Sequence, residues 1–432
     1  MKIEKMIAVL VVSIVLGTSC SIDKNGEASM FMANSMHSNV SDSNPIKNTP
    51  KTVWKFKTEG EVISSPVIQN NTVFIGSNDG NLYALNSENG NLKWSFKTDG
   101  AINSTPLVAN EKVFFLSYDG HFYCLNSNNG KLVWKFKTEG ESKFKVKDYF
   151  NGKFEPDFWD FYLSSAIVKE NTIYFGSSDA HVYALNLQDG NLVWKYKTGG
   201  SIHSSPAISD NSLVVGSWDS KVYCLDITTG QEKWSYTTDQ DFKDYIWLGV
   251  QASPSIENGV VYIGSRDAKF YALSLESGTV KWVKDEFDRS WMPSSAAIGT
   301  DNIYTGSSDS MSFFSINKET GSINYATKTN AYTFSTPTID SEMAYVGAAN
   351  GRLFGIELQT GKIMWEYRTD ASKTDTIKMF DENGVLNQER AMELSKGIDN
   401  MPQLSMVYRD VFKSVGAILS SPTKSNQVVY FG

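Results

Sequence analysis

The chain has 432 residues, 41% of them hydrophobic and 13% aromatic, which is the composition of a globular protein and not of a disordered one. Its net charge of −8 argues against nucleic acid as a partner, because surfaces that track phosphates are basic. Apart from a short run near the start, no apolar stretch could span a bilayer.

The first element predicted in chain order is an export signal over residues 1–20. Two lysines precede an apolar run at 6–16, and small residues then lead to Cys20. The pattern resembles a bacterial lipoprotein signal, in which Cys20 would become a lipid-bearing N-terminus, although Leu16 lies four residues before the cysteine and not three. The alternative is an ordinary secretory signal with an incidental cysteine. We favour the lipoprotein and expect a cell-envelope protein, exported and anchored by lipid to the outer membrane or cell surface.

Residues 21–50 are rich in Ser, Asn and Lys and lack apolar periodicity, so we expect a flexible tether. The domain predicted after it covers residues 51–432 and consists of repeats. Tryptophans mark the repeat at spacings of 40 to 60 residues, with a tyrosine at one position. The marker residues are Trp54, Trp94, Trp134, Trp194, Trp234, Trp282, Tyr325 and Trp365.

Two further motifs keep the same register: Gly-Ser-x-Asp, as at Gly76 to Asp79, and a Ser-Ser-Pro start, as at Ser64 to Pro66. One unit, Val62 to Thr98, divides into four short apolar strands, and Asp-Gly and Asn-Gly pairs suit the tight turns between them. Repeated four-stranded antiparallel units predict a β-propeller. The small Ser-Ser-Pro residues are expected at the axis and the tryptophans at the rim, with lysines protecting the outer edge.

The units resemble the repeats of the PQQ-binding-like β-propeller family, and the segment 226–234, Asp-Ile-Thr-Thr-Gly-Gln-Glu-Lys-Trp, matches the end of the family pattern well. This resemblance covers residues 53–432. It implies the fold more than the function, since the family includes quinoprotein dehydrogenases as well as non-catalytic scaffolds such as the lipoprotein of the outer-membrane β-barrel assembly machine.

The repeat count predicts an all-β, eight-bladed propeller with four-stranded antiparallel blades and a monomeric ring. Its closing blade would join 51–58, a fourth strand, to 418–432, which supplies two strands. The Tyr-Ala-Leu strand is missing from that blade. Either the closing blade is short or the sequence is truncated at Gly432, and we favour truncation.

Cys124 and Cys224 occupy the small position of the Tyr-Ala-Leu motif in two blades. A whole repeat separates them, so they are expected to be buried, free thiols.

Long insertions connect outer strands to the next inner strands at 139–163, 239–250 and 370–415, with a shorter one near 285–292 and a helix expected across 388–396. All four lie on one face of the disc, and their aromatic and acidic residues suit recognition of a peptide, glycan or flat cofactor. The alternative is that most of these aromatics form a small core that folds the insertions onto the disc. The candidate binding face comprises Tyr149, Phe154, Phe158, Trp159, Tyr245, Trp247, Trp291, Asp157, Asp160, Asp244 and Asp288.

Catalytic motifs are scarce, and no metal site is expected. His121 and His181 occupy a repeat position predicted to be exposed, where other copies hold Asn, Lys or Arg. The quinoprotein dehydrogenases typically carry a vicinal Cys-Cys pair and a calcium ligand set, neither of which this sequence matches. The leading hypothesis is a non-catalytic envelope scaffold without a cofactor that binds a protein or peptide partner. The alternatives are a PQQ- and Ca²⁺-dependent dehydrogenase and, less favoured, a glycan-binding surface protein.

Overall fold

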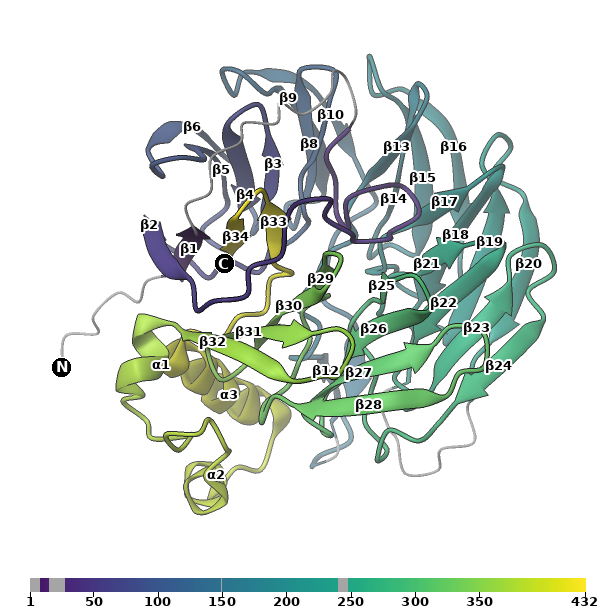
Figure 1. Cartoon of the computed structure of the whole chain (residues 1–432). Helices are drawn as coiled ribbons and strands as arrows, with labels where there is room; N and C mark the ends of the chain where they lie inside the picture. The colour runs from purple at the N-terminus through teal and green to yellow at the C-terminus, as the bar shows by residue number, and fades with distance from the viewer. Residues whose placement is uncertain (1–7, 15–27, 149, 240–247) are drawn as a thin grey trace.

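A computed structural model describes residues 8–14, 28–148, 150–239 and 248–432. Four-stranded antiparallel sheets stand around a common axis as the blades of a propeller (Figure 1). In each blade the strands follow in chain order from the axis to the rim. Alternating apolar residues form them, and the middle strands are buried on both faces because each sheet packs between two neighbours.

Seven blades consist of four consecutive strands each. The first three are β3 (Val67–Gln69), β4 (Thr72–Gly76), β5 (Asn81–Asn86) and β6 (Leu92–Lys97); β7 (Leu107–Ala109), β8 (Lys112–Ser117), β9 (His121–Asn126) and β10 (Leu132–Lys137); and β13 (Ile167–Lys169), β14 (Thr172–Gly176), β15 (His181–Asn186) and β16 (Leu192–Lys197). The fourth and fifth are β17 (Ala207–Ser209), β18 (Ser212–Ser217), β19 (Lys221–Asp226) and β20 (Glu232–Thr237); and β21 (Ser255–Glu257), β22 (Val260–Gly264), β23 (Phe270–Ser274) and β24 (Val280–Lys284). The sixth and seventh are β25 (Ala297–Ile298), β26 (Asn302–Gly306), β27 (Ser312–Asn317) and β28 (Ile323–Lys328); and β29 (Thr338–Ile339), β30 (Met343–Ala348), β31 (Arg352–Glu357) and β32 (Ile363–Arg368).

The two ends of the chain meet in a further sheet of mixed origin, in the order β2 (Lys51–Thr58), β1 (Ala8–Ile14), β34 (Val428–Phe431) and β33 (Thr423–Ser425). The expectation of an eight-bladed propeller is therefore corrected to seven blades, because only seven sheets are built from one repeat each. In the closing sheet the missing Tyr-Ala-Leu strand is replaced by β1, from the segment expected to be the export signal.

A belt of hydrogen bonds surrounds the axis and explains the Ser-Ser-Pro motif. The second Ser or Thr of the motif donates its backbone N–H to the hydroxyl of the same residue in the next sheet, as from Ser165 to Ser205 at 2.9 Å. The belt crosses the junction of the chain ends, where the Ser421 amide donates to Ser65 at 2.9 Å. The small residues expected at the axis are confirmed there, and their hydroxyls link neighbouring sheets.

The tryptophans lie on the outer strands, as predicted, and join neighbouring sheets at the rim. The indole N–H of Trp94, for example, donates to the Ser127 carbonyl of the next blade at 3.0 Å. The last tryptophan, Trp365, instead donates to Ile46 of the N-terminal segment at 2.7 Å.

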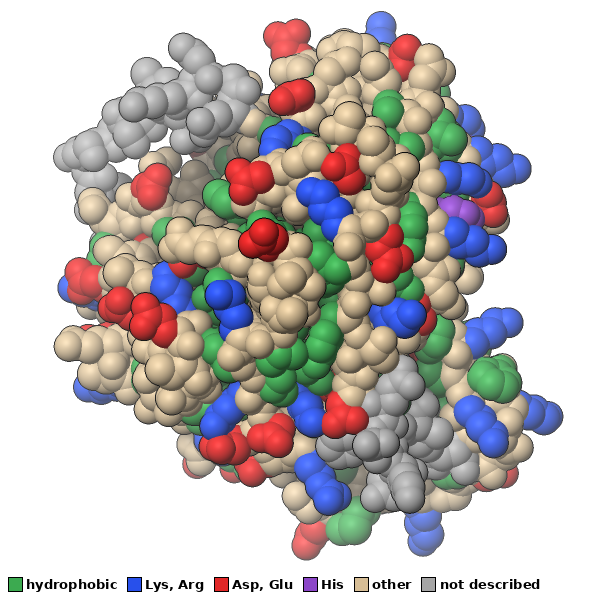
Figure 2. All heavy atoms as spheres, turned by 90° about the vertical axis from the view of Figure 1, so that its right-hand side faces the viewer, with side chains coloured by type: hydrophobic (Ala, Val, Ile, Leu, Met, Phe, Trp, Pro, Cys, Tyr) green, Lys and Arg blue, Asp and Glu red, His purple; other side chains and the backbone are tan. Residues whose placement is uncertain are grey.

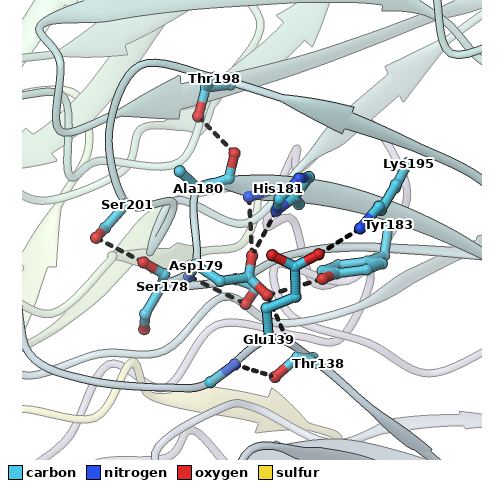
Figure 3. Close-up of polar contacts among 12 residues, drawn as sticks. Thr138, Glu139, Ser178, Asp179, Ala180, His181, Tyr183, Lys195, Thr198 and Ser201 are labelled. Atoms are coloured by element: carbon cyan, nitrogen blue, oxygen red, sulfur yellow. Dashed lines mark hydrogen bonds and ion pairs between the residues drawn. The ribbon is translucent and has the colours of Figure 1, made fainter.

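The recurring aspartate of Gly-Ser-x-Asp links the end of one blade to the next, as Figure 3 shows for Asp179. Its carboxylate accepts from the backbone N–H of His181 at 3.0 Å, from the Tyr183 hydroxyl at 2.7 Å, and from the backbone N–H of Glu139, in the preceding blade's outer connection, at 2.8 Å. His181 itself is only 6% exposed, with Nδ1 3.2 Å from the same carboxylate. The prediction that this position is exposed is therefore wrong for His181.

Residues 28–50, expected to be part of a flexible tether, instead lie across the ring (Figure 1). The backbone of residues 29–39 forms hydrogen bonds with the inner strands β7, β17, β21, β25 and β29. His37 is fully buried, and its Nδ1 lies 2.8 Å from the Pro254 carbonyl oxygen. An ordered segment thus covers the axis on the side where the inner strands end.

The insertions carry the remaining elements. The first contains the hairpin β11 (Lys145–Lys147) and β12 (Phe154–Pro156), and the last contains α1 (Asp370–Thr374), α2 (Gln388–Ser395) and α3 (Met401–Val415). The helix expected across 388–396 is confirmed as α2. No helix among the described residues is long and apolar enough to cross a membrane. On the side of the ring that carries β16–β24, acidic and basic side chains are interspersed (Figure 2).

Candidate functional site

Residues 157–161 of the first insertion, which we call the plug, lie beside the axis on the insertion face. Side chains from three separate blades hold them. These contacts are Arg266 to the Asp157 carboxylate, His203 to the Asp160 carboxylate at 2.7 Å, Gln251 to the Trp159 carbonyl at 3.2 Å, and Asn103 to the Phe161 carbonyl at 2.7 Å.

Arg266 is the centre of this arrangement and is only 1% exposed. Its guanidinium carbon lies 4.3 Å from the ring centroid of Trp218 and 4.6 Å from that of Trp291, so the cation is placed between two indole faces. It donates to Asp157 and, at 2.8 and 3.1 Å, to Gln251. The buried carboxylate and the buried guanidinium thereby neutralise each other.

His203 and Asp160 form a second buried pair, with both side chains at 0% exposure. Burial alone would lower the pKa of His203, but the Asp160 carboxylate outweighs it and raises that pKa. The other ring nitrogen lies 2.7 Å from the Ser178 hydroxyl, which also donates to Glu141. Burial raises the pKa of Glu141 and lowers that of the neighbouring Lys143.

Trp159 anchors an aromatic core between the first and last insertions. Its ring centroid lies 4.9 Å from that of Tyr408 on α3, and 5.1 Å from that of Tyr332 in the loop before β29. Phe158 packs in the same cluster. The predicted satellite core is confirmed for Phe158 and Trp159, which bind the insertions to the disc.

The candidate face predicted from the sequence divides into three groups. Phe158, Trp159, Asp157 and Asp160 are buried in the plug and are engaged by the chain itself. Trp291 is half-buried against Arg266, whereas Phe154 and Asp288 are exposed. The rest lie outside the described residues, as does the proposed lipidation site Cys20; they are Tyr149, Asp244, Tyr245 and Trp247.

Three elements of the insertions each carry a large exposed apolar side chain. Phe154 of β12 is 69% exposed, Met406 of α3 is 57% exposed and Met392 of α2 is 67% exposed. Helix α3 lies against both β12 and α2. We call these three residues the insertion patch.

Sequence reasoning missed the residues that hold the plug. Trp218 and Arg266 occupy the variable position of Gly-Ser-x-Asp, and His203 and Gln251 lie next to the axial serines. One sequence feature could have revealed them. They differ from the small or polar residues, such as Ser178, that other repeats carry at the same positions of an otherwise constant motif.

The residues of the plug are poorly suited to bind a metal ion or a cofactor. Within the described ranges, no group of three or more His, Cys, Asp and Glu side chains could hold a metal ion. The Asp157 and Asp160 carboxylates of the plug are paired with Arg266 and His203. Trp159 packs among aromatic side chains of the chain itself. These residues do not fit a flat quinone with a calcium ion at the plug.

Comparison with known proteins agrees with the repeat architecture. The family profile of the outer membrane protein assembly factor BamB matches residues 38–149, 157–286 and 284–386, which is well over half of the chain. The chain belongs to this family. The resemblance to PQQ-type propeller repeats is thereby confirmed. The matched ranges leave out residues 150–156 of the first insertion, include the second insertion and end within the last.

Solved structures add the fold alone, because their sequence identities are low. BamB from Moraxella catarrhalis has a TM-score of 0.54 at 17% identity, covering 75% of this chain and 95% of its own. A europium-containing methanol dehydrogenase has a TM-score of 0.64 at 13% identity, covering 93% and 98%. The computationally designed Ika8 protein has a TM-score of 0.55 at 16% identity, covering 71% and 86%. No curated protein matches the chain in sequence.

Proposed function

We propose that the chain is a non-catalytic scaffold of the cell envelope that is lipid-anchored through Cys20 and binds a protein partner on its insertion face, in outer-membrane protein assembly. Processing at Cys20 would remove β1, so the closing sheet of the anchored protein would retain β2, β34 and β33. Membership of the BamB family supports the cell-envelope location and the kind of partner. The observation that carries the proposal is the plug, because its ionisable groups are satisfied internally. Apolar side chains of the insertions remain exposed for a partner.

The direction of the inner strands supports a particular orientation of the propeller relative to the membrane. In the second blade, Asn103, four residues before β7, contacts the plug, and Val108 within β7 contacts the N-terminal segment. Seven residues separate Cys20 from Ala28, which span roughly 25 Å when extended. An anchor at Cys20 would therefore hold the N-terminal side toward the membrane and direct the insertion patch away from it.

Affinity capture from detergent-solubilised envelopes tests this proposal. The exported protein is expected to retain components of outer-membrane protein assembly, and the double variant F154S/M406S is expected to lose them. L192S/V193S is the matched control, because Leu192 and Val193 are 46% and 52% exposed but lie on the rim strand β16. Retention of the same partners by F154S/M406S, or no capture by the unmodified protein, would contradict the proposed face.

A PQQ- and Ca²⁺-dependent dehydrogenase is the second candidate, since the europium-containing methanol dehydrogenase shares the fold over 93% of the chain. Reconstitution with PQQ and Ca²⁺ separates the two functions. Under the scaffold proposal neither a shift of the quinone absorbance nor alcohol-dependent dye reduction is expected. Both signals together would establish the dehydrogenase instead.

A further inference from the structure

A pocket of about 310 Å³ lies between the seventh blade and the last insertion. Arg352 at the start of β31 and Arg368 at the end of β32 form its blade side, and Lys373, Lys378 and Gly384 belong to the insertion side. Its volume lies at the small end of the range for small-molecule sites. It is separate from the plug, none of whose residues line it.

The seventh blade departs from the repeat at this pocket. In five blades the Gly-Ser-x-Asp aspartate accepts from the hydroxyl of a tyrosine on the third strand. Asn350 and Phe354 replace that aspartate and tyrosine here, so the usual carboxylate is absent. The same blade places Arg352 where other copies hold Asn81, His121 or Lys221.

Two guanidinium groups at the pocket each have an N–H donor without a hydrogen-bond partner. Arg352 is 3% exposed; its terminal nitrogens donate to the Glu366 carboxylate at 2.7 and 3.0 Å and to the Glu382 carbonyl at 2.7 Å, but its Nε has no partner. Arg368 donates from a terminal nitrogen to the Ser372 carbonyl at 2.8 Å, and its buried Nε also has no partner. Buried donors of this kind are costly unless a ligand or water accepts from them.

The carboxyl groups around the pocket are largely occupied. Asp375 accepts from the backbone N–H groups of Lys378 and Phe380, and Asp381 accepts from those of Asn383 and Val385. Lys373 lies 3.3 Å from Asp370, which Lys55 also contacts, and Glu382 is exposed. The donors left open at this site are therefore cationic.

We propose that this pocket binds the oxyanion group of a small molecule, a carboxylate or a phosphate, through Arg352 and Arg368. Guanidinium groups match planar and tetrahedral oxyanions through charge-assisted hydrogen bonds. The unpartnered Asn350 Oδ1 adds an acceptor at the same pocket, which suits a ligand that carries a hydroxyl group beside its oxyanion.

Calorimetric titration of the purified protein at low salt tests the site with three probes: glucuronate, inorganic phosphate and neutral glucose. Glucuronate or phosphate is expected to bind, and the one that binds identifies the oxyanion as a carboxylate or a phosphate. Glucose is expected not to bind. In R368Q the affinity is expected to fall roughly 10- to 100-fold, the loss that corresponds to one or more charge-assisted hydrogen bonds. K137Q is the matched control, because Lys137 ends the outer strand of the second blade and does not line this pocket.

Added salt is expected to weaken binding, and the bound anion is expected to raise the melting temperature of the unmodified protein but not that of R368Q. If R368Q does not fold, K378E serves instead, because Lys378 is exposed and lines the same pocket. Absence of binding by both anions, equal binding of glucose, or unchanged affinity in the folded variant would overturn the proposal.

Discussion

The carboxylate of Asp148 lies 3.0 Å from the backbone nitrogen of Met401, although the two residues are 253 positions apart in the sequence. Met401 is the first residue of α3, so a side chain of the first insertion satisfies an otherwise open N–H group at the start of a helix in the last. Asp148 is fully buried and also accepts from Phe150 and Asn151. The two insertions are therefore one unit.

Replacement of this carboxylate should loosen that unit. D148A is expected to lower the free energy of unfolding by about 1–2 kcal/mol, the usual cost of losing a cap at a helix start. Urea denaturation measures the loss. D99A is the control, since Asp99 is an exposed residue in a short connection between blades, and an equal loss in both variants would contradict the assignment.

The His203–Asp160 pair predicts a pH dependence. The folded-state pKa of His203 is raised, so its contribution to stability is complete below the unfolded value near 6.5 and is lost as pH rises through the folded value. The raised pKa of Glu141 also makes stability fall as pH rises, starting from its lower unfolded value, whereas the lowered pKa of Lys143, whose charge acts on His203, has the opposite effect. Denaturation of the wild type from pH 6 to pH 9 should show declining stability, at most about 1.4 kcal/mol per pH unit for one proton.

In H203Q the slope from this pair should be smaller over the same interval. A slope equal to that of the wild type would show that His203 does not bind the proton.

His37 has the opposite dependence. Burial lowers its pKa to about 4, so its stabilising contribution is present above the unfolded value near 6.5 and is lost as pH falls toward 4. The N-terminal segment should lose up to about 3 kcal/mol across this interval. Hydrogen exchange at residues 29–39 measures the release, and H37N should remove most of its pH dependence. Uniform exchange across all blades would contradict a local effect.

The two described cysteines should resist modification. Both thiols are free and buried, and burial raises the pKa of Cys124 to about 12 and that of Cys224 to about 11. Almost no thiolate is therefore present at pH 8. In a C20S background, Ellman's reagent should report no reactive thiol in the native protein and two after denaturation. Rapid labelling of the native protein would contradict the buried positions.

The axial belt should make a measurable contribution to stability. S205A removes the acceptor for the buried Ser165 amide, and an unsatisfied buried amide costs about 1–3 kcal/mol. Thermal denaturation compares it with S209A, because Ser209 is partly exposed at the end of β17, the inner strand that follows Ser205. Equal melting temperatures would show that water replaces the hydroxyl.

Much of the propeller could be predicted because each blade repeats local information. The turn residues, the small axial serines and the large rim tryptophans recur in register, so their positions follow from one unit. The closing sheet was predicted in part: residues 51–58 and the last two strands share it, as expected, but the strand β1 between them was missed because it belongs to a segment with an export-signal pattern. The N-terminal segment was also missed, since it binds mainly through backbone groups, which leave no sequence pattern.

The site was harder to predict because its partners are far apart in the chain. Asp157 and Arg266 are 109 positions apart, and Asp160 and His203 are 43 apart. The sequence correctly places Trp159 and the two aspartates in one insertion, but it does not reveal the direction in which their side chains point. Aromatic and acidic residues there pack inward because blades on several sides supply complementary cations and rings.

The N-terminal segment has a mechanical consequence. Its backbone is bonded to inner strands from five blades, so a force applied at Ala28 would meet several attachment points around the ring. All of these bonds would have to break before the load reached β2. A protein tethered at this end could thus resist tension that would peel away a single terminal strand.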